Sequence, residues 1–401
     1  MKKLFLVTFL LIGFMVQAQN NWQWRGPERD GIYPEKGLLT KWPTEGLKKL
    51  WVFEGLGIGH ASPAISNGKI YINGLVDEKG VLFCLDMNGK LLNKVEYGEE
   101  WTGGHPGARA IPTINDGRIY ITTGTGKLFC FDQQSLKVLW KKDLMAEFGA
   151  RQIDWGINES SLIEGDMLIS TPGGEKASIV ALDKKTGAVI WKSEAKGEKS
   201  AYDSPLLIKG HGAPLVVTQT EFHLVGVDLA TGKLRFSYEI KNRYNIHPNT
   251  PLYEDGMMFV TTGYGKGCTM LKLAADGNSV EKVWETNMMD NQMGGVVKIG
   301  NFIYTSGHQN RGWFCYEWTT GKEMYRDRTL ANGNIISAEG LLYCYSDKGE
   351  LALVRPNPGR FEIISQMMVT DGTKEHWAHP VIHNKVLYVH HGEALIAYSL
   401  Q

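Results

Sequence analysis

Side chains that could do chemistry gather at eight points of the sequence, each shortly before an apolar stretch. They include five of the 11 histidines, together with carboxyl, amide and indole groups. The candidate ligand-binding residues are His60, His105, Arg109, Trp155, Asn158, Glu159, Tyr202, Asp203, His247, Asn249, Trp377 and His379. Residues of similar type stand at the comparable positions Gln292, Asn332, Asn334 and His376.

Two kinds of chemistry suit these residue types. Imidazole and carboxyl groups exchange protons and bind metal ions, so Glu159, Asp203 and His247 form a candidate acid–base or metal trio. Indole rings stack on flat molecules, so Trp155 and Trp377 are candidates for contact with a sugar ring or another flat ligand. Polar side chains are also common in exposed loops, so solvation alone remains an alternative explanation for each residue.

A repeated sheet pattern must position these residues. One copy runs from Pro63 through the turn Asn67-Gly68-Lys69 to the strand ending at Asp86. Alternating apolar residues between Gly, Asn and Asp turns predict antiparallel strands. The copies recur roughly every 40 to 50 residues, which is typical of four-stranded propeller blades. The first strand of each blade lines the axis of a propeller, so we expect the candidate residues to surround one axial face.

The sequence contains eight copies of the repeat. The last copy lacks its fourth strand, and we expect the first strand of the repeat region to supply it. Third strands end around Asp86, Asp132, Asp183, Asp228, Leu273, Trp318, Val354 and Tyr398, but only seven fourth strands follow them. Residues 48–53 have the pattern of the missing fourth strand. We therefore predict an all-β fold, an eight-bladed β-propeller of four-stranded antiparallel blades, closed by pairing of the N-terminal strand with the last blade.

Large apolar residues recur in the predicted fourth strands. Trp51, Trp140, Trp191 and Trp284 share one position, shortly after a turn. We expect these four indoles to have a structural role and to pack between neighbouring blades.

The N-terminus has the features of a secretory signal peptide. Lys2 and Lys3 precede a short apolar run that ends near Ala18, and the run is too short to cross a bilayer. The expected organisation is a signal peptide at 1–18, a leader segment packing on the propeller at 19–45, and the propeller at 46–401. The mature protein would be exported to the periplasm or the extracellular space, with no transmembrane segment.

The composition argues against nucleic acid as a partner and against disulfide bonds. The 401 residues carry 43 basic and 43 acidic side chains, and this balance argues against nucleic-acid binding. The five cysteines are well separated and lack paired motifs, so we expect small buried apolar side chains rather than disulfides. A monomer is expected.

One segment carries a family resemblance. Residues 181–191, Ala-Leu-Asp-Lys-Lys-Thr-Gly-Ala-Val-Ile-Trp, resemble the tryptophan-docking motif of the PQQ (pyrroloquinoline quinone) repeat family. Residues 22–31, Trp-Gln-Trp-Arg-Gly-Pro-Glu-Arg-Asp-Gly, are similar to the leader of secreted PQQ-like propeller proteins. The resemblance covers nearly the whole mature chain and implies the quinoprotein-like propeller fold.

The resemblance also has implications for cofactor binding. Quinoprotein dehydrogenases of this fold hold PQQ in the central funnel, typically with Ca²⁺, and several place a disulfide of adjacent cysteines against it. This chain departs from that pattern because it has no adjacent cysteines. The propeller scaffold of the outer-membrane β-barrel assembly machinery is another relative and uses no cofactor.

The sequence therefore favours an exported, non-catalytic binding scaffold that presents a polar axial face to a protein, a glycan or a small ligand. We expect no cofactor, with PQQ and Ca²⁺ as the less favoured alternative. The catalytic alternative uses the same face, either as a carbohydrate-active hydrolase or lyase or as a PQQ-dependent dehydrogenase.

Overall fold

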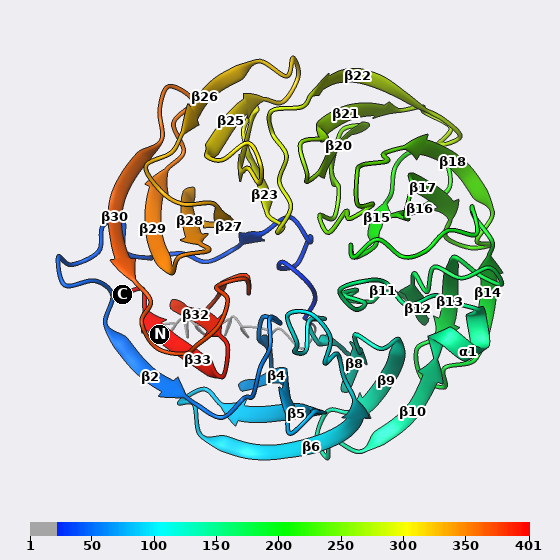
Figure 1. Ribbon diagram of the computed structural model, residues 1–401, viewed down its shortest axis with the longest axis horizontal. Helices are drawn as coiled ribbons and strands as arrows, with labels where there is room; N and C mark the ends of the chain where they lie inside the picture. Colours follow the sequence, from blue (N-terminus) through cyan, green and yellow to red (C-terminus); the bar gives the residue numbers. More distant parts are fainter. Residues whose placement is uncertain (1–21) are drawn as a thin grey trace, which may run out of the picture.

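Eight separate β-sheets surround a central axis in the computed structural model, which describes residues 22–401 (Figure 1). The predicted all-β, eight-bladed propeller is confirmed. The predicted signal peptide lies outside the described residues. Within residues 22–401, no helix is long and apolar enough to cross a membrane.

Each blade contributes one strand to each of four layers. The innermost strands of blades 1 to 8 are β3 (Ala64–Ser66), β7 (Thr113–Asn115), β11 (Leu162–Glu164), β15 (Leu206–Ile208), β19 (Leu252–Glu254), β23 (Val296–Ile299), β27 (Gly333–Ala338) and β31 (Val381–His383). The second strands are β4 (Lys69–Val76), β8 (Arg118–Thr122), β12 (Met167–Ser170), β16 (Leu215–Gln219), β20 (Met257–Thr262), β24 (Phe302–Ser306), β28 (Leu341–Ser346) and β32 (Val386–His391).

The remaining strands form the outer half of each blade. The third strands are β5 (Lys79–Asp86), β9 (Lys127–Asp132), β13 (Ile179–Asp183), β17 (His223–Asp228), β21 (Gly267–Leu273), β25 (Trp313–Glu317), β29 (Glu350–Arg355) and β33 (Ala394–Ser399). The outermost strands are β6 (Leu91–Glu99), β10 (Val138–Asp143), β14 (Val189–Ser193), β18 (Leu234–Glu239), β22 (Val280–Thr286), β26 (Glu323–Asp327), β30 (Glu362–Met368) and, in blade 8, β2 (Lys49–Phe53). One short helix, α1 (Leu144–Phe148), follows β10.

The ring closes as predicted, through the N-terminal strand β2. This strand pairs antiparallel with β33 in the order β2-β33-β32-β31, with Trp51 opposite Ala397 and Lys49 opposite Tyr398. Blade 8 is therefore built from both ends of the repeat region, which main-chain hydrogen bonds hold together. No blade is left at an open end of the ring.

The repeated turns explain how one blade attaches to the next. In blade 3, Asp183 accepts hydrogen bonds from the N–H and hydroxyl groups of Thr186, both at 2.8 Å. Gly187 follows at φ 72°, a left-handed conformation that glycine adopts without strain. The indole of Trp140, from blade 2, lies on Gly187, where an added Cβ would be 2.9 Å from the ring.

All four tryptophans pack in this way, each on the turn of the following blade. Their indole N–H groups donate to main-chain carbonyls there, at 2.9 to 3.2 Å. The pairs are Trp51 with Met87, Trp140 with Lys184, Trp191 with Leu229, and Trp284 with Trp318. A tight Thr-Gly or Asn-Gly turn thus supplies both a flat surface and a hydrogen-bond acceptor for the neighbouring blade.

Residues 22–33 cross the ring, and the chain then runs outward past blade 7, where the Trp42 N–H donates to the Ser365 hydroxyl, before it reaches β2. In Figure 1 this dark blue segment passes through the centre of the propeller. It ends in a short strand, β1 (Ile32–Tyr33), which pairs parallel with β27 and makes blade 7 five-stranded. That fifth strand was not predicted, because a strand of two residues is too short to show the alternation of apolar and polar side chains.

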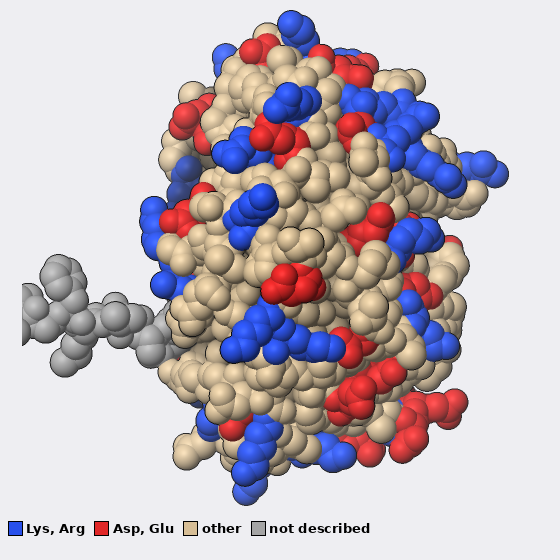
Figure 2. All heavy atoms as spheres, turned by 90° about the vertical axis from the view of Figure 1, so that its left-hand side faces the viewer, with Lys and Arg blue, Asp and Glu red and all other residues tan. Residues whose placement is uncertain are grey.

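The charges are spread over the outside of the disc. Figure 2 shows basic and acidic side chains interspersed over the side formed by the blades at the left of Figure 1. This mixture agrees with the balanced count of 43 basic and 43 acidic residues.

Candidate functional site

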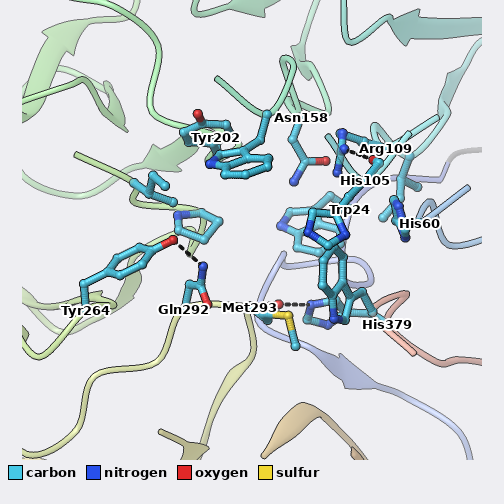
Figure 3. A pocket seen from close by; sticks show the side chains of 16 residues that line it. Trp24, His60, His105, Arg109, Asn158, Tyr202, Tyr264, Gln292, Met293 and His379 are labelled. Atoms are coloured by element: carbon cyan, nitrogen blue, oxygen red, sulfur yellow. Dashed lines mark hydrogen bonds between the residues drawn. The ribbon is translucent and has the colours of Figure 1, made fainter. Parts of the chain in front are cut away.

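A pocket of about 330 Å³ lies on the propeller axis (Figure 3). Its walls come from the loops that lead into the innermost strands, which we call the axial loops. Every blade except blade 7 contributes at least one axial-loop residue. The lining residues are Trp24, His60, His105, Arg109, Ile111, Trp155, Asn158, Tyr202, Ile246, Pro248, Tyr264, Gln292, Met293, Gly294, Trp377 and His379.

The crossing segment forms one wall of the pocket and fills the axis beside it. The Trp24 indole N–H donates to the Thr250 hydroxyl at 3.2 Å. Arg25 donates to the carbonyl of Val296 at 2.8 Å, and Arg29 donates to the carbonyls of Ser161 at 2.6 Å and Pro205 at 2.9 Å. These buried guanidinium groups attach the segment to the innermost strands of several blades, because their donors satisfy main-chain carbonyls inside the ring.

His379 is held in one tautomer. Arg25 Nη1 donates to Nδ1 of the imidazole at 3.1 Å, so Nε2 carries the proton and donates to the Met293 carbonyl at 3.3 Å. Burial and the adjacent guanidinium hold the pKa of His379 well below its usual range. This histidine is therefore a neutral wall group with both ring nitrogens engaged.

Two further histidines flank Trp377. The His60 ring lies 5.1 Å from the indole, and burial lowers the pKa of His60 to about 3, so this imidazole is neutral. The His105 ring lies 4.7 Å from the same indole, and its Nδ1 is 2.6 Å from Oε1 of Glu375. His105 thus forms a histidine–carboxylate pair beside the pocket.

Arg109 is the only arginine among the described residues that line the pocket. Its Nη2 group donates to the carbonyls of Gly104, at 3.3 Å, and His105. The Nε–H is buried and has no hydrogen-bond partner within residues 22–401. Burial lowers the pKa of Arg109 to about 10, so the group stays charged at neutral pH.

Amide and hydroxyl groups line the opposite side. Gln292 donates from Nε2 to the Tyr264 hydroxyl at 2.7 Å, which leaves the Gln292 carbonyl oxygen without a donor among the described residues. In Figure 3, Asn158 points into the space between Tyr202 and Arg109. These groups give the pocket several hydrogen-bonding positions around an otherwise aromatic wall.

Trp155 supplies an exposed aromatic surface at the pocket. Its side chain is 41% exposed, which is unusual for tryptophan in this protein. Gly104 packs against one side of the indole, where an added Cβ would be 2.6 Å from the ring, and the His105 ring lies 5.7 Å away. The indole is thus supported from behind and open toward solvent.

The structure does not bring the predicted acid–base trio into the pocket. Glu159 and Asp203 are each 1% exposed, and His247 is fully buried. Glu159 accepts a hydrogen bond from the Thr171 N–H at 2.6 Å, and Asp203 accepts one from the Gln219 N–H at 3.0 Å. These carboxyls hold the main chain between strands and do not face the space where a ligand could sit.

The predicted residues therefore divide into two sets. Those that line the pocket are His60, His105, Arg109, Trp155, Asn158, Tyr202, Trp377 and His379. Those buried behind its wall are Glu159, Asp203, His247 and Asn249. Asn249 donates to the Asn291 carbonyl at 3.0 Å and accepts from the Gly295 N–H at 3.1 Å, so it connects blades 5 and 6.

Sequence reasoning missed two aromatic residues of the wall. Trp24 belongs to the crossing segment, which the repeat pattern does not place. Tyr264 lies between Gly263 and Gly265 in a strand connection and has φ 63°, a strained conformation for tyrosine. An aromatic residue between two glycines was the available signal, because such a turn projects its side chain away from the sheet.

The residues present do not fit a quinone held with Ca²⁺. No carboxylate lines the described pocket, although Ca²⁺ prefers several carboxylate or carbonyl oxygens. Within residues 22–401, no three His, Cys, Asp or Glu side chains are grouped to hold a metal ion. All five cysteines are buried, free thiols, so no disulfide can lie against a cofactor.

Comparison with known proteins identifies relatives of two kinds. The family described as outer membrane protein assembly factor BamB matches residues 78–285. The 1-butanol dehydrogenase (quinone) of Thauera butanivorans is 32% identical over 128 residues, which are 30% of this chain and 20% of that enzyme. Quinoprotein alcohol dehydrogenase PedH of Pseudomonas putida is 30% identical over 107 residues, 26% of this chain and 18% of the enzyme.

Solved structures share the fold at low sequence identity. BamB from Moraxella catarrhalis has a TM-score of 0.64 at 14% identity, covering 88% of this chain and 99% of that one. A europium-containing methanol dehydrogenase has a TM-score of 0.63 at 12% identity, covering 93% and 90%. The chain matches a fifth or less of the two curated dehydrogenases above. With half of its length matched by the family, the chain belongs to the PQQ-repeat β-propellers of the BamB type.

Proposed function

We propose that this protein is an exported, non-catalytic binding propeller whose axial pocket receives the ring of a glycan. One observation carries the proposal: the pocket combines an exposed, supported indole at Trp155 with hydrogen-bonding side chains and has no carboxylate in its described lining. Sugar rings present apolar faces that stack on indoles and hydroxyl groups that pair with amides and guanidinium groups.

The size of the pocket supports a small ligand. Its volume of about 330 Å³ is at the lower end of the range for small-molecule sites, which is roughly 300–1,000 Å³. We therefore expect the end of a glycan or one or two sugar units to enter, and not a folded protein surface. A larger glycan would continue outward past Trp155.

Catalysis of glycan hydrolysis is less well supported by the same groups. Glycosidases use two carboxyl groups on either side of one bond, and Glu159 and Asp203 are buried behind the wall. The His105–Glu375 pair favours a lyase as the second candidate, because a carboxylate-supported imidazole can remove a proton. Release of unsaturated sugar ends, which elimination forms and hydrolysis does not, would favour that candidate; the proposal expects none.

The test is direct binding to the purified mature chain. Glucose, galactose and their β-linked disaccharides would be titrated by calorimetry into the wild type and into Trp155→Ala. We expect measurable binding that falls at least tenfold in Trp155→Ala. Leu139→Ala is the control, because Leu139 is similarly exposed (49%) but lies on the outermost strand of blade 2. Equal binding by all three proteins, or by none, would contradict the proposal.

A further inference from the structure

Arg109 has no direct ion-pair partner within the described structure. No carboxylate in residues 22–401 forms an ion pair with it, although the side chain is half-buried and lines the pocket. Its Nη2 group is occupied by two main-chain carbonyls, while its Nε–H is buried without a partner. A half-buried guanidinium without a direct ion-pair partner favours an anionic group in the space that it lines.

The nearest acidic groups are already engaged elsewhere. Glu100 accepts hydrogen bonds from the Tyr97 hydroxyl at 2.9 Å, the Trp101 N–H at 2.9 Å and the Gly124 N–H at 2.6 Å. Burial raises the pKa of Glu100, and its hydrogen bonds and the charge of Arg109 oppose the rise. Glu375 is paired with His105 at 2.6 Å. Both carboxyl groups lie close enough to stabilise the charge of Arg109, but neither forms a direct ion pair with it.

We infer that the ligand of the axial pocket is an acidic sugar, whose carboxylate pairs with Arg109 while its ring stacks on Trp155. The inference rests on the proposed function and deepens it. A carboxylate in the pocket would accept hydrogen bonds from the guanidinium group of Arg109, which lines the pocket, and would form the ion pair that no described carboxylate forms. The sugar's hydroxyl groups would meet Asn158 and the free carbonyl oxygen of Gln292, which an aromatic acid could not satisfy.

The other ionisable groups around the pocket fit this orientation. The described lining offers no second cation, and its histidines His60 and His379 are neutral because burial lowers their pKa values. His105 lies 2.6 Å from the Glu375 carboxylate, which would balance a positive charge on the imidazole. One acidic group per ring is thus the charge that the site can accept, and a sulfated or doubly charged sugar should bind less well than a uronic acid.

The experiment compares sugars that differ only in the acidic group. Glucuronate and galacturonate would be titrated against glucose and galactose at neutral pH and at two salt concentrations. We expect each acid to bind about ten- to a hundredfold tighter than its neutral partner in the wild type, with a smaller advantage at high salt. Arg109→Gln should remove the advantage, and Arg109→Lys should restore only part of it, because lysine lacks the planar donor pair.

Arg151→Gln is the matched control. Arg151 lies in the axial loop of blade 3, is exposed, and also donates from Nη2 to a main-chain carbonyl, that of Gly197 at 3.2 Å. This variant should retain the full preference for the acids. Circular dichroism and melting curves would show that each variant is folded.

The outcomes separate this inference from the proposed function. If acids and neutral sugars bind equally and both depend on Trp155, the proposed function stands and the acidic preference is wrong. If the preference persists in Arg109→Gln, the assignment of the carboxylate to Arg109 is wrong. If neither acids nor neutral sugars bind, both proposals fail.

Discussion

Glu159 offers a test of whether a buried carboxyl in this ring is structural. The side chain is 1% exposed and accepts a hydrogen bond from the Thr171 N–H at 2.6 Å. Burial raises its pKa from 4.5 to about 7, with hydrogen bonds from Thr171 and the charge of Arg29 opposing the rise. A carboxyl with this pKa resembles a general acid, but Glu159 does not line the pocket.

The sign of the expected pH dependence follows from that shift. A carboxyl whose pKa is higher in the folded state stabilises the fold fully below about pH 4.5 and loses this contribution as pH rises through about 7. The rise of the Glu159 pKa from 4.5 to about 7 corresponds to about 3 kcal/mol of folding free energy, at about 1.4 kcal/mol for each pH unit. Glutamine has nearly the same shape but does not ionise, so Glu159→Gln should lack this loss.

The assay is urea unfolding of the wild type and Glu159→Gln from pH 4.5 to 8. The free energy of unfolding of the wild type should fall relative to the variant by about 3 kcal/mol across this range. Only the difference between the two proteins is informative, because neutral histidines such as His247, with its pKa lowered to about 4, lose stability in the opposite direction, as pH falls.

Glu175→Gln is the control, since Glu175 is exposed on the same blade. The free energy of unfolding of Glu175→Gln should change with pH in the same way as that of the wild type. A difference between wild type and Glu159→Gln that stays constant with pH would refute the reasoning, because Glu159 would then be charged in the folded protein or accessible to water.

Further expectations concern the blade contacts, the closure and the cofactor. Trp191→Ala should lower the free energy of unfolding by about 3–5 kcal/mol, and Trp191→Phe, which chiefly loses the hydrogen bond to Leu229, by about 1–2 kcal/mol; equal urea midpoints would contradict this. Gly232→Ala places a Cβ 2.4 Å from the Trp191 ring and should destabilise more than Gly197→Ala, which has similar positive φ but no atom within 4 Å; equal melting temperatures would show that the contact is unimportant. Deleting residues 46–54 should expose the edge of β33 and cause aggregation, so a deletion variant that melts like the full chain would argue against the role of β2. Incubation with PQQ and Ca²⁺ followed by gel filtration should leave no bound chromophore; stoichiometric retention would reverse the conclusion drawn from the pocket residues.

The sequence predicted the site in outline because axial loops recur with the blades. The period of the repeat located His60, His105, Arg109 and Trp377 near one axis without any local motif. The same reasoning could not separate a side chain that faces the axis from one turned into the wall. Glu159 and Asn158 are adjacent in sequence, yet Asn158 lines the pocket and Glu159 is buried.

That separation depends on contacts between residues far apart in the chain. Arg29 lies against the carbonyls of Ser161 and Pro205, and Trp24 reaches the pocket only because the segment that holds it crosses the ring. This segment contains no repeated pattern of apolar residues, so its route through the ring could not be predicted from the sequence. Its position is decided by the buried donors and acceptors that it meets inside the propeller.

The sequence alone predicted the number of blades and the strand that closes them, and it placed the candidate residues around one axial face. These features follow from a repeat whose turns and apolar positions recur, since each copy must bury its faces against its neighbours. Two features could be seen only in the folded protein: which polar residues reach the pocket, and that Arg109 has no direct ion-pair partner there. The reason is that the orientation and pairing of a loop side chain depend on distant groups packed around it.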